Sequence, residues 1–371
     1  MIPGLETARR LVVKIGSSLL VEETSGQIRR AWLDSLSDDV ARCRARGQEV
    51  ILVSSGAVAV GRRHLGLTPP LRLEEKQAAA ATGQIRLAHA YQESLARHDL
   101  TVAQVLLTID DSENRRRYLN ARNTLDTLLR LGAVPVINEN DTVATQEIRF
   151  GDNDRLAARV AQMTGADALV LFSDIDGLYT GNPRSNPDAE FIPVVREITA
   201  EVEAMAGDPG SAYGSGGMVT KLAAARICMH AGCRMAIALG QPLHPLQAIE
   251  NGARCTWFLP GDEPKNAWKR WIAGSLKPEG EIIVDEGACR ALRSGRSLLP
   301  AGVVAVSGDF QRGDGVVVRG PDGRVIARGL SAYSAEDARL IIGHRSGDIA
   351  EILGYQGRDE IIHRDDLVIE K

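Results

Sequence analysis

Long apolar runs, paired cysteines and aromatic side chains are all scarce in this chain. No apolar stretch approaches the roughly 20 residues of a membrane-spanning helix. The N-terminus has no charged segment followed by an apolar one, so we expect no secretory signal peptide. The five cysteines are scattered and never spaced Cys-x-x-Cys, which predicts reduced thiols in a cytoplasmic protein and no structural zinc. Aromatic residues make up only 4% of the chain, so we expect an aliphatic core.

A large excess of one charge is also missing. The formal net charge of -4 gives no general attraction to nucleic acid or to anionic membranes. The 371 residues suffice for about two domains. We place a first domain at 1–259, a linker at 260–280 and a second domain at 281–371, because the character of the sequence changes after Pro260.

The first domain alternates β-branched runs with helical patterns. Most of the runs are apolar on both faces, which is typical of strands buried in a parallel sheet. The helical stretches 31–47 and 116–132 both end at Gly, a usual C-terminal stop. This alternation predicts an α/β fold, a three-layer αβα sandwich with a mostly parallel sheet. Strands are expected at 11–15, 49–55, 101–108, 133–138, 167–172 and 234–239, and a turn-rich hairpin insertion at 177–195.

The second domain has a different pattern of short strands separated by Gly-rich turns. One helix is expected at 334–343. Together these features predict a small β-barrel-like domain. Its strands are expected at 281–286, 302–310, 314–320 and 324–333.

Residues suited to binding anions follow the predicted strands of the first domain. Ligands of parallel sheets bind beyond the carboxyl ends of the strands. Lys14 stands at the first such end, Ser54 and Ser55 follow the second strand, and a Gly-rich loop leads into a helix near Lys221. A glycine loop before a helix N-terminus is a simple phosphate site. Neither GxxxxGK[ST] nor GxGxxG is present, which disfavours a Walker-type P-loop and a dinucleotide-binding dehydrogenase. The two lysines and the Ser- and Gly-rich turns suit phosphoryl transfer by positioning and charge neutralisation.

Two clusters of Asp and Asn lie near the same edge, at 138–141 and 152–154. A helix start needs only one capping residue, so the surplus indicates a binding site. Asp152 can equally be a plain N-cap, and so can Ser54 or Ser55. An anionic acceptor would meet repulsion of about 4 kcal/mol per charge pair at 4 Å and an effective dielectric of ~20. Lysines and a metal ion would have to offset that repulsion.

These segments resemble the amino acid kinase family. LVVKIGSSLL, VSSGAVAVG, LNARNTL, VPVINENDTVAT, GDNDRLAA, GLYTGNPRSNP and GSGGMVTK are similar, in this order, to the members that phosphorylate L-glutamate in proline synthesis. The tail SLLPAGVVAVSGDFQRGD resembles a PUA domain. The resemblance implies that ATP, with Mg²⁺, phosphorylates the side-chain carboxylate of L-glutamate to give L-glutamyl 5-phosphate and ADP.

The matching motifs also imply roles for individual residues. Lys14 and Lys221 would neutralise the transferring phosphoryl group, and Asp154 would hold both lysines without taking a proton. Glutamate would be bound by Ser55, Asp141 and Asn153, with Asp141 suited to the α-ammonium. ATP would contact Lys14, Ser173, Asp174, Ser215, Gly216, Gly217, Met218, Val219, Thr220 and Lys221.

Two alternatives stay open. Another kinase of the family, acting on acetylglutamate, carbamate or a nucleoside monophosphate, would not need Asp141 and Asn153 for a free ammonium. The PUA domain could instead bind RNA, but residues 278–371 hold 12 Lys and Arg against 16 Asp and Glu, which disfavours phosphate binding. The resemblance further implies a homo-oligomer, a dimer or tetramer, and inhibition by proline at the glutamate pocket.

Overall fold

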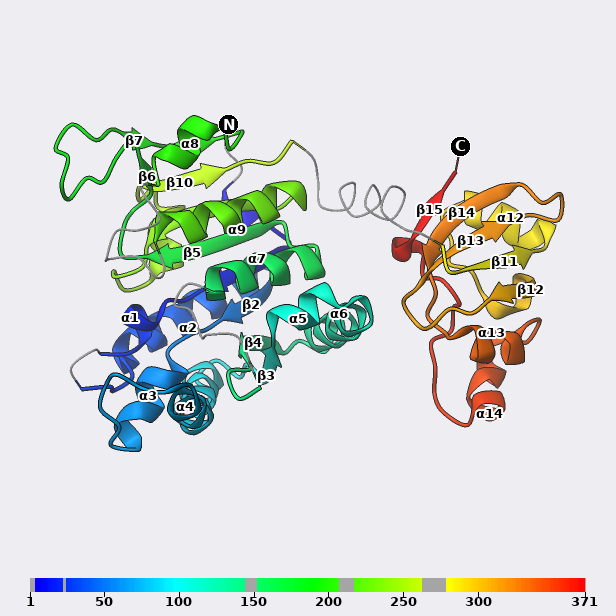
Figure 1. Ribbon diagram of the computed structural model, residues 1–371, viewed down its shortest axis with the longest axis horizontal. Helices are drawn as coiled ribbons and strands as arrows, with labels where there is room; N and C mark the ends of the chain where they lie inside the picture. Colours follow the sequence, from blue (N-terminus) through cyan, green and yellow to red (C-terminus); the bar gives the residue numbers. More distant parts are fainter. Residues whose placement is uncertain (1–3, 23–24, 144–151, 207–216, 262–277, 371) are drawn as a thin grey trace. The chain divides into compact units, whose positions relative to one another are not determined.

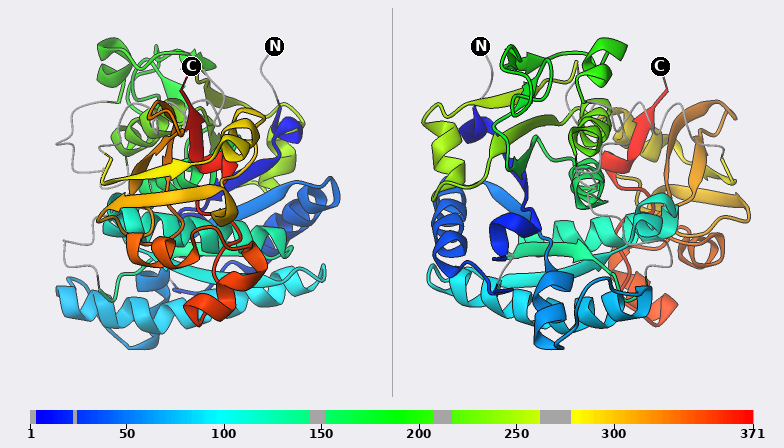
Figure 2. Two further views of the ribbon diagram at one scale, coloured as in Figure 1. Left: turned by 90° about the vertical axis from the view of Figure 1, so that its right-hand side faces the viewer. Right: turned by 60° about the vertical axis from the view of Figure 1, so that its left-hand side comes forward.

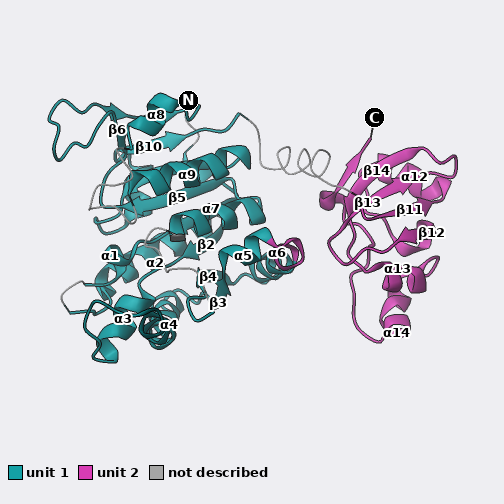
Figure 3. Cartoon of the chain, viewed as in Figure 1, with its two compact units in different colours: residues 1–113, 120–264 teal, residues 114–119, 265–371 magenta. Residues whose placement is uncertain are grey.

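The computed structural model describes residues 4–22, 25–143, 152–206, 217–261 and 278–370. The chain divides into two compact units, residues 1–113 with 120–264 and residues 114–119 with 265–371 (Figure 3). The expected linker at 260–280 falls mostly outside the described residues, so the domain boundaries stay a prediction. Among the residues described, no helix has the length and apolarity to cross a bilayer.

The first unit is built on an eight-stranded sheet with the order β3-β4-β2-β1-β5-β9-β10-β8. All neighbouring strands run parallel except β9 and β10. The six predicted strands are confirmed, whereas β8 and β10 were not expected. The strands are β1 (Arg10–Lys14), β2 (Glu49–Val53), β3 (Val102–Leu107), β4 (Val134–Glu139), β5 (Ala168–Ser173), β8 (Val194–Val195), β9 (Arg234–Leu239) and β10 (Cys255–Phe258).

Helices cover both faces of this sheet, as the αβα prediction requires (Figures 1 and 2). The alternation of β1 assigns its residues to the two faces. Leu11 and Val13 pack with Leu33 of α2 in one core, while Lys14 points to the face that carries α7. The helices are α1 (Ser17–Leu20), α2 (Arg30–Ala45), α3 (Ala57–His64), α4 (Leu73–Ala96), α5 (Ile109–Glu113), α6 (Arg115–Arg130), α7 (Asp152–Thr164), α8 (Ala200–Ala204), α9 (Met218–His230) and α10 (Pro245–Glu250), with a short 3-10 helix at Leu5–Thr7.

The predicted helix stops and the hairpin insertion are also confirmed. Gly47 and Gly132 follow α2 and α6 with φ of 81° and 84°, the left-handed conformation that ends a helix. In the insertion, β6 (Leu178–Tyr179) pairs antiparallel with β7 (Phe191–Ile192). The chain then returns to the main sheet as β8, beside β10.

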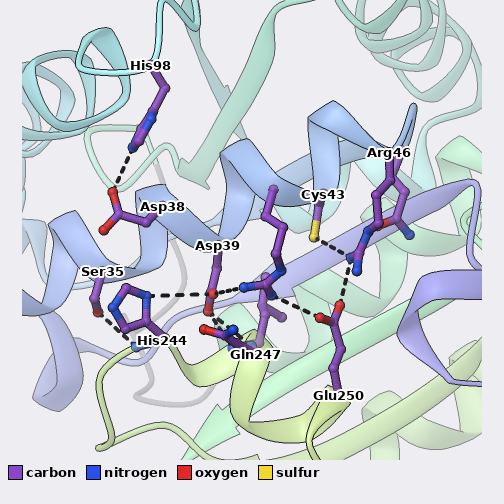
Figure 4. Close-up of polar contacts among 12 residues, drawn as sticks. Ser35, Asp38, Asp39, Cys43, Arg46, His98, His244, Gln247 and Glu250 are labelled. Carbon is purple, nitrogen blue, oxygen red and sulfur yellow. Dashed lines mark hydrogen bonds and ion pairs between the residues drawn. The ribbon is translucent and has the colours of Figure 1, made fainter.

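A buried carboxylate fixes α10 against α2 (Figure 4). Asp39 is fully buried, and its Oδ2 accepts a hydrogen bond from the backbone N–H of Leu246 at 2.8 Å. Its Oδ1 accepts from Arg42 at 2.9 Å. Arg42 also pairs at 3.0 Å with Glu250, at the other end of α10. Both ends of α10 are therefore attached to α2, which keeps the chain after β9 in place.

The second unit is a five-stranded sheet with the order β12-β11-β13-β14-β15. Its four predicted strands and the predicted helix are confirmed, but the expectation of a single helix is wrong, because α12 and α14 are also present. α12 is capped by Asp285, which accepts from Ala288 N–H at 2.6 Å. The elements are β11 (Gly280–Val284), α12 (Glu286–Arg293), β12 (Val303–Gly308), β13 (Gly315–Arg319), β14 (Val325–Leu330), α13 (Ala335–Ile341), α14 (Ile349–Leu353) and β15 (Leu367–Ile369), with 3-10 turns at Pro300–Gly302, Ser346–Asp348 and Arg364–Asp366.

Candidate active site

The carboxyl ends of β1, β2, β4 and β5 meet at one edge of the main sheet. Lys14 at the end of β1 is in register with Val53 of β2 and Leu171 of β5, and Val53 is in register with Ile137 of β4. The strand order runs from β1 to β2 on one side and to β5 on the other. Such a switch point is where ligands bind in open α/β sheets.

A buried ion triad stands at this point, formed by Lys14, Asp154 and Lys221. Lys14 Nζ lies 2.6 Å from Asp154 Oδ1, and Lys221 Nζ lies 3.2 Å from Oδ2. The Thr220 hydroxyl donates to Oδ2 at 3.0 Å. Asp154 is only 1% exposed, and both lysines are buried. One strand and two helices (β1, α7 and α9) therefore converge on a single carboxylate.

The charge state of Asp154 follows from these contacts. Burial alone raises the pKa of this carboxyl, but the nearby charges of Lys14 and Lys221 and the hydrogen bonds from Lys14 and Thr220 outweigh it. The pKa of Asp154 is therefore held below its usual value of 3.8. Asp154 therefore stays ionised at neutral pH.

The two serines after β2 do not cap the following helix, so that alternative is wrong. The N-cap of α3 is Gly56, with φ of 100° and no side-chain cap. The Ser55 hydroxyl donates to the carbonyl of Ile15 at 2.7 Å. Ser54 is buried, and its hydroxyl accepts from Tyr91 at 3.0 Å. The Ser55 bond joins the turns after β1 and β2, and the Ser54 bond joins the second of these turns to α4.

A network of side-chain amides lies beside these turns. Asn153 Nδ2 donates to the Ser54 carbonyl at 3.0 Å and to Asn138 Oδ1 at 3.3 Å. Asn138 Nδ2 donates to Gln84 Oε1 at 2.7 Å. Gln84 and Tyr91, both on α4, were not among the residues expected at the site. No local pattern marks Gln84, because its partner Asn138 lies 54 residues later in the chain.

Asp141 stands in a hollow of about 250 Å³, which Gln84 and Glu139 also line. Burial raises the pKa of Asp141 to about 6. Burial is the only cause of this shift, and no charged group among the described residues contributes to it. A buried carboxylate of this kind is suited to a cationic group of a ligand.

The residues expected to contact ATP are placed in part. Ser173 ends β5, and its hydroxyl donates to Asp174 at 3.2 Å. Asp174 is largely exposed and pairs with Arg184 of the hairpin insertion at 2.8 Å. Gly217 caps α9, whose first turn holds Met218, Val219, Thr220 and Lys221. Ser215, Gly216 and the side chain of Asp152 lie outside the described residues, so the N-cap alternative for Asp152 stays open.

Comparisons with known proteins show which families the chain is similar to. Residues 9–238 match the model of the amino acid kinase family, and residues 280–353 match that of the PUA domain. A protein of Paramagnetospirillum magneticum named glutamate 5-kinase is 72% identical over 99% of both chains. One of Rhodospirillum rubrum with the same name is 64% identical over 97% of this chain and 96% of its own.

Proposed function

The chain belongs to the amino acid kinase family and carries a PUA domain, and we propose that it acts as a glutamate 5-kinase. It transfers the γ-phosphoryl group of ATP to the side-chain carboxylate of L-glutamate, the activity that its relatives' name states. The observation that carries the proposal is the ion triad of Lys14, Asp154 and Lys221 at the switch point of the sheet. The product, L-glutamyl 5-phosphate, enters proline synthesis.

The triad supplies what phosphoryl transfer to an anion needs. A carboxylate that approaches ATP is repelled by the phosphate charges, and the two ammonium groups of Lys14 and Lys221 offset that repulsion. Asp154 holds both side chains in position, so little reorganisation is needed at the moment of transfer. A carboxylate acceptor carries no proton at neutral pH, so the transfer needs no general base. Asp154 is accordingly proposed to hold the two lysines and not to accept a proton.

The acceptor, L-glutamate, is proposed to bind beside Asp141 and Asn153. Asp141 provides the negative charge for the α-ammonium of glutamate, and Asn153 and Ser55 provide polar contacts. An acetylated amine offers no positive charge, so this pair of residues favours the free amino acid over N-acetylglutamate.

Mg²⁺ belongs to the proposal as part of the substrate MgATP. Protein sites for Mg²⁺ commonly use one or two carboxylates together with substrate phosphates. Within the described ranges, no three His, Cys, Asp or Glu side chains form a metal-binding group. Ser173, Asp174 and the residues from Ser215 to Lys221 are proposed to contact the nucleotide.

Proline is proposed as an inhibitor that competes for the same acceptor site. It shares an α-carboxylate and a cationic amine with glutamate, so Asp141 and Asn153 suit both. Raising L-glutamate should relieve the inhibition, and inhibition that saturating glutamate leaves unchanged would place proline elsewhere. A homo-oligomer, on the family resemblance, and a cytoplasmic location, on the scattered cysteines, complete the proposal.

The test is release of ADP from MgATP with four acceptors in parallel: L-glutamate, N-acetylglutamate, carbamate and UMP. Hydroxylamine is added to convert an acyl phosphate to a hydroxamate. We expect ADP and hydroxamate with L-glutamate alone. Turnover of another acceptor without turnover of glutamate would keep the family and discard the roles of Asp141 and Asn153.

A further inference from the structure

Helix α4 reaches the candidate acceptor site through one buried amide, that of Gln84. We propose that Gln84 is a positioning residue: through Asn138 it sets the side-chain amide of Asn153, so that Asn153 Oδ1 is left to accept a hydrogen bond from the ammonium of the acceptor. The three residues are called the amide relay below. This inference deepens the proposed function and rests on it.

The first part of the relay has a fixed orientation. The backbone N–H of Glu139 donates to Asn138 Oδ1 at 2.9 Å. A backbone N–H can only donate, so the oxygen of Asn138 must face it and the NH₂ group must face Gln84. Gln84 Oε1 accepts from that NH₂ group at 2.7 Å. Because Gln84 and Asn138 are both buried, water has little access to replace this bond.

The second part is fixed by a backbone acceptor. The carbonyl of Ser54 accepts from Asn153 Nδ2 at 3.0 Å. A carbonyl can only accept, so the NH₂ group of Asn153 must face Ser54. Asn138 Oδ1 lies 3.3 Å from the same NH₂ group and supports this orientation. The relay is therefore anchored at two backbone groups, the N–H of Glu139 and the carbonyl of Ser54. Asn138 would lose the first bond if its amide flipped, and Asn153 would lose the second.

The outcome is an acceptor oxygen without a donor. Asn153 Oδ1 is buried and has no hydrogen-bond partner in the part of the chain that the structure describes. A buried acceptor left in this state is destabilising until a ligand donor reaches it. An ammonium group has three donors and a positive charge, so it suits this oxygen together with the carboxylate of Asp141. Gln84 and Asp141 line the same hollow.

The substitution Gln84→Met tests the relay. Methionine has a similar length but offers Asn138 no comparable acceptor, so the relay loses its first bond. We expect the KM for L-glutamate to rise about tenfold, with kcat and the KM for ATP within about threefold of the unaltered chain. Glutarate, which is glutamate without its amine, should keep its inhibition constant within about threefold.

Two further variants serve as controls. Gln84→Glu keeps an oxygen acceptor for Asn138 in either protonation state, so its KM for L-glutamate should stay within about threefold. Gln92→Met makes the same change at an exposed position of α4 and should match the unaltered chain. The unfolding midpoint of each variant is measured beside the kinetics, so that a loss of folded protein is not read as weaker binding.

The glutarate measurement separates positioning from general damage. Equal weakening of glutamate and glutarate in Gln84→Met would overturn the inference, because a merely structural role affects both ligands. So would an unchanged KM for L-glutamate. An unaltered chain that forms no hydroxamate with L-glutamate would overturn the proposed function, and this inference with it.

Discussion

At the scale of single residues, the two buried carboxylates of the site, Asp154 and Asp141, have different electrostatic surroundings. Asp154 is held ionised between two lysines, whereas the carboxyl of Asp141 is buried without such support and has a raised pKa. The first arrangement suits a carboxylate that holds two lysine ammonium groups in fixed positions. The second favours a carboxylate that gains a cationic partner only when a ligand arrives.

The substitution Lys221→Ala tests the proposed role of the ion triad. It removes one ammonium group from the triad while Lys14 stays paired with Asp154. We expect kcat to fall roughly 10²–10³-fold, the usual scale for one electrostatic stabiliser. Lys76→Ala, on α4 and outside the proposed site, is the control and should leave kcat within about twofold. A loss confined to the KM for L-glutamate would mean that Lys221 has been given the wrong role.

The substitution Asp141→Asn should weaken binding and strengthen the fold. The KM for L-glutamate should rise about tenfold or more with a smaller effect on kcat, because the charge for the ammonium is lost. The raised pKa means that the stability contributed by protonated Asp141 is present at low pH and lost as pH rises through about 6. At pH 7.5 the neutral amide should therefore stabilise the chain by roughly 1–3 kcal/mol.

Chemical denaturation at two pH values checks the stability half of this prediction. The gain should shrink to about 0.5 kcal/mol at pH 4, where Asp141 is protonated in the folded chain and about 40% protonated in the unfolded chain. Asp110→Asn, an exposed change, should be neutral at both pH values. A gain of equal size at pH 4 would show that burial of the charge is not its cause.

Part of the site could be predicted from residues alone. Lys14, Asp154 and Lys221 stand at strand ends and helix starts, where the sequence pattern and the family motifs both place them. Gln84 could not be predicted, because a glutamine within a helical pattern gives no sign that it meets a strand end some 50 residues later in the chain. Its bond to Asn138 depends on how α4 crosses the sheet, which no local pattern specifies.

At the scale of elements, α4 is held against α3 by direct backbone contact. A Cβ on Gly83 would lie 1.9 Å from the carbonyl oxygen of Ala57, and one on Gly61 would lie 1.7 Å from that of Ala79. Only glycine permits so close an approach. This contact fixes how closely α4 packs against α3. It therefore also fixes the position of Gln84, the residue after Gly83.

The substitution Gly83→Ala should therefore be costly, although alanine is the better helix former by about 1 kcal/mol. The obstructing atom is backbone and cannot rotate away, so we expect a net loss of about 2–4 kcal/mol in the free energy of unfolding. The KM for L-glutamate should also rise, because Gln84 moves with the helix. Thermal unfolding and kinetics measure both effects.

Gly261→Ala provides the matched control for this change. Nothing lies within 4 Å of its added Cβ, and its φ is not in the left-handed region. It should be neutral within about 0.5 kcal/mol. A stabilised Gly83→Ala variant would mean that the two helices can separate at little cost.

Elements with a strong local signal could be predicted, and those with a weak one could not. The strands of the parallel core can be recognised in the sequence as apolar runs, and Gly47 and Gly132 mark the ends of α2 and α6. The two-residue β8 is too short to carry a pattern, and β10 forms only because β9 lies beside it. For α12 the signal existed, because Asp285 is a good N-cap and Cys289 and Leu292 lie three residues apart on its buried face.

At the scale of the whole molecule, the proposed catalytic residues and the net charge lie in different parts of the chain. All the described site residues belong to the first unit. The region 278–371, with 12 Lys and Arg against 16 Asp and Glu, carries the net negative charge. The PUA domain therefore lacks the surplus of cations on which RNA affinity largely depends.

We accordingly expect no submicromolar binding of structured RNA by the full chain. Fluorescence anisotropy with a labelled hairpin RNA at 50 and 150 mM salt checks this. Tight binding that weakens steeply with salt would refute the charge argument and give the PUA domain a second role.

The raised pKa of Asp141 also makes substrate recognition a proton-coupled event. An ammonium ion requires the ionised carboxylate, so binding at a pH near 6 must expel a proton from those molecules in which Asp141 still holds one. About half a proton per glutamate should leave at that pH, and almost none at pH 8. The heat of binding at pH 6 should thus vary with the ionisation enthalpy of the buffer, and acidification of the surroundings would by itself slow the enzyme at low glutamate.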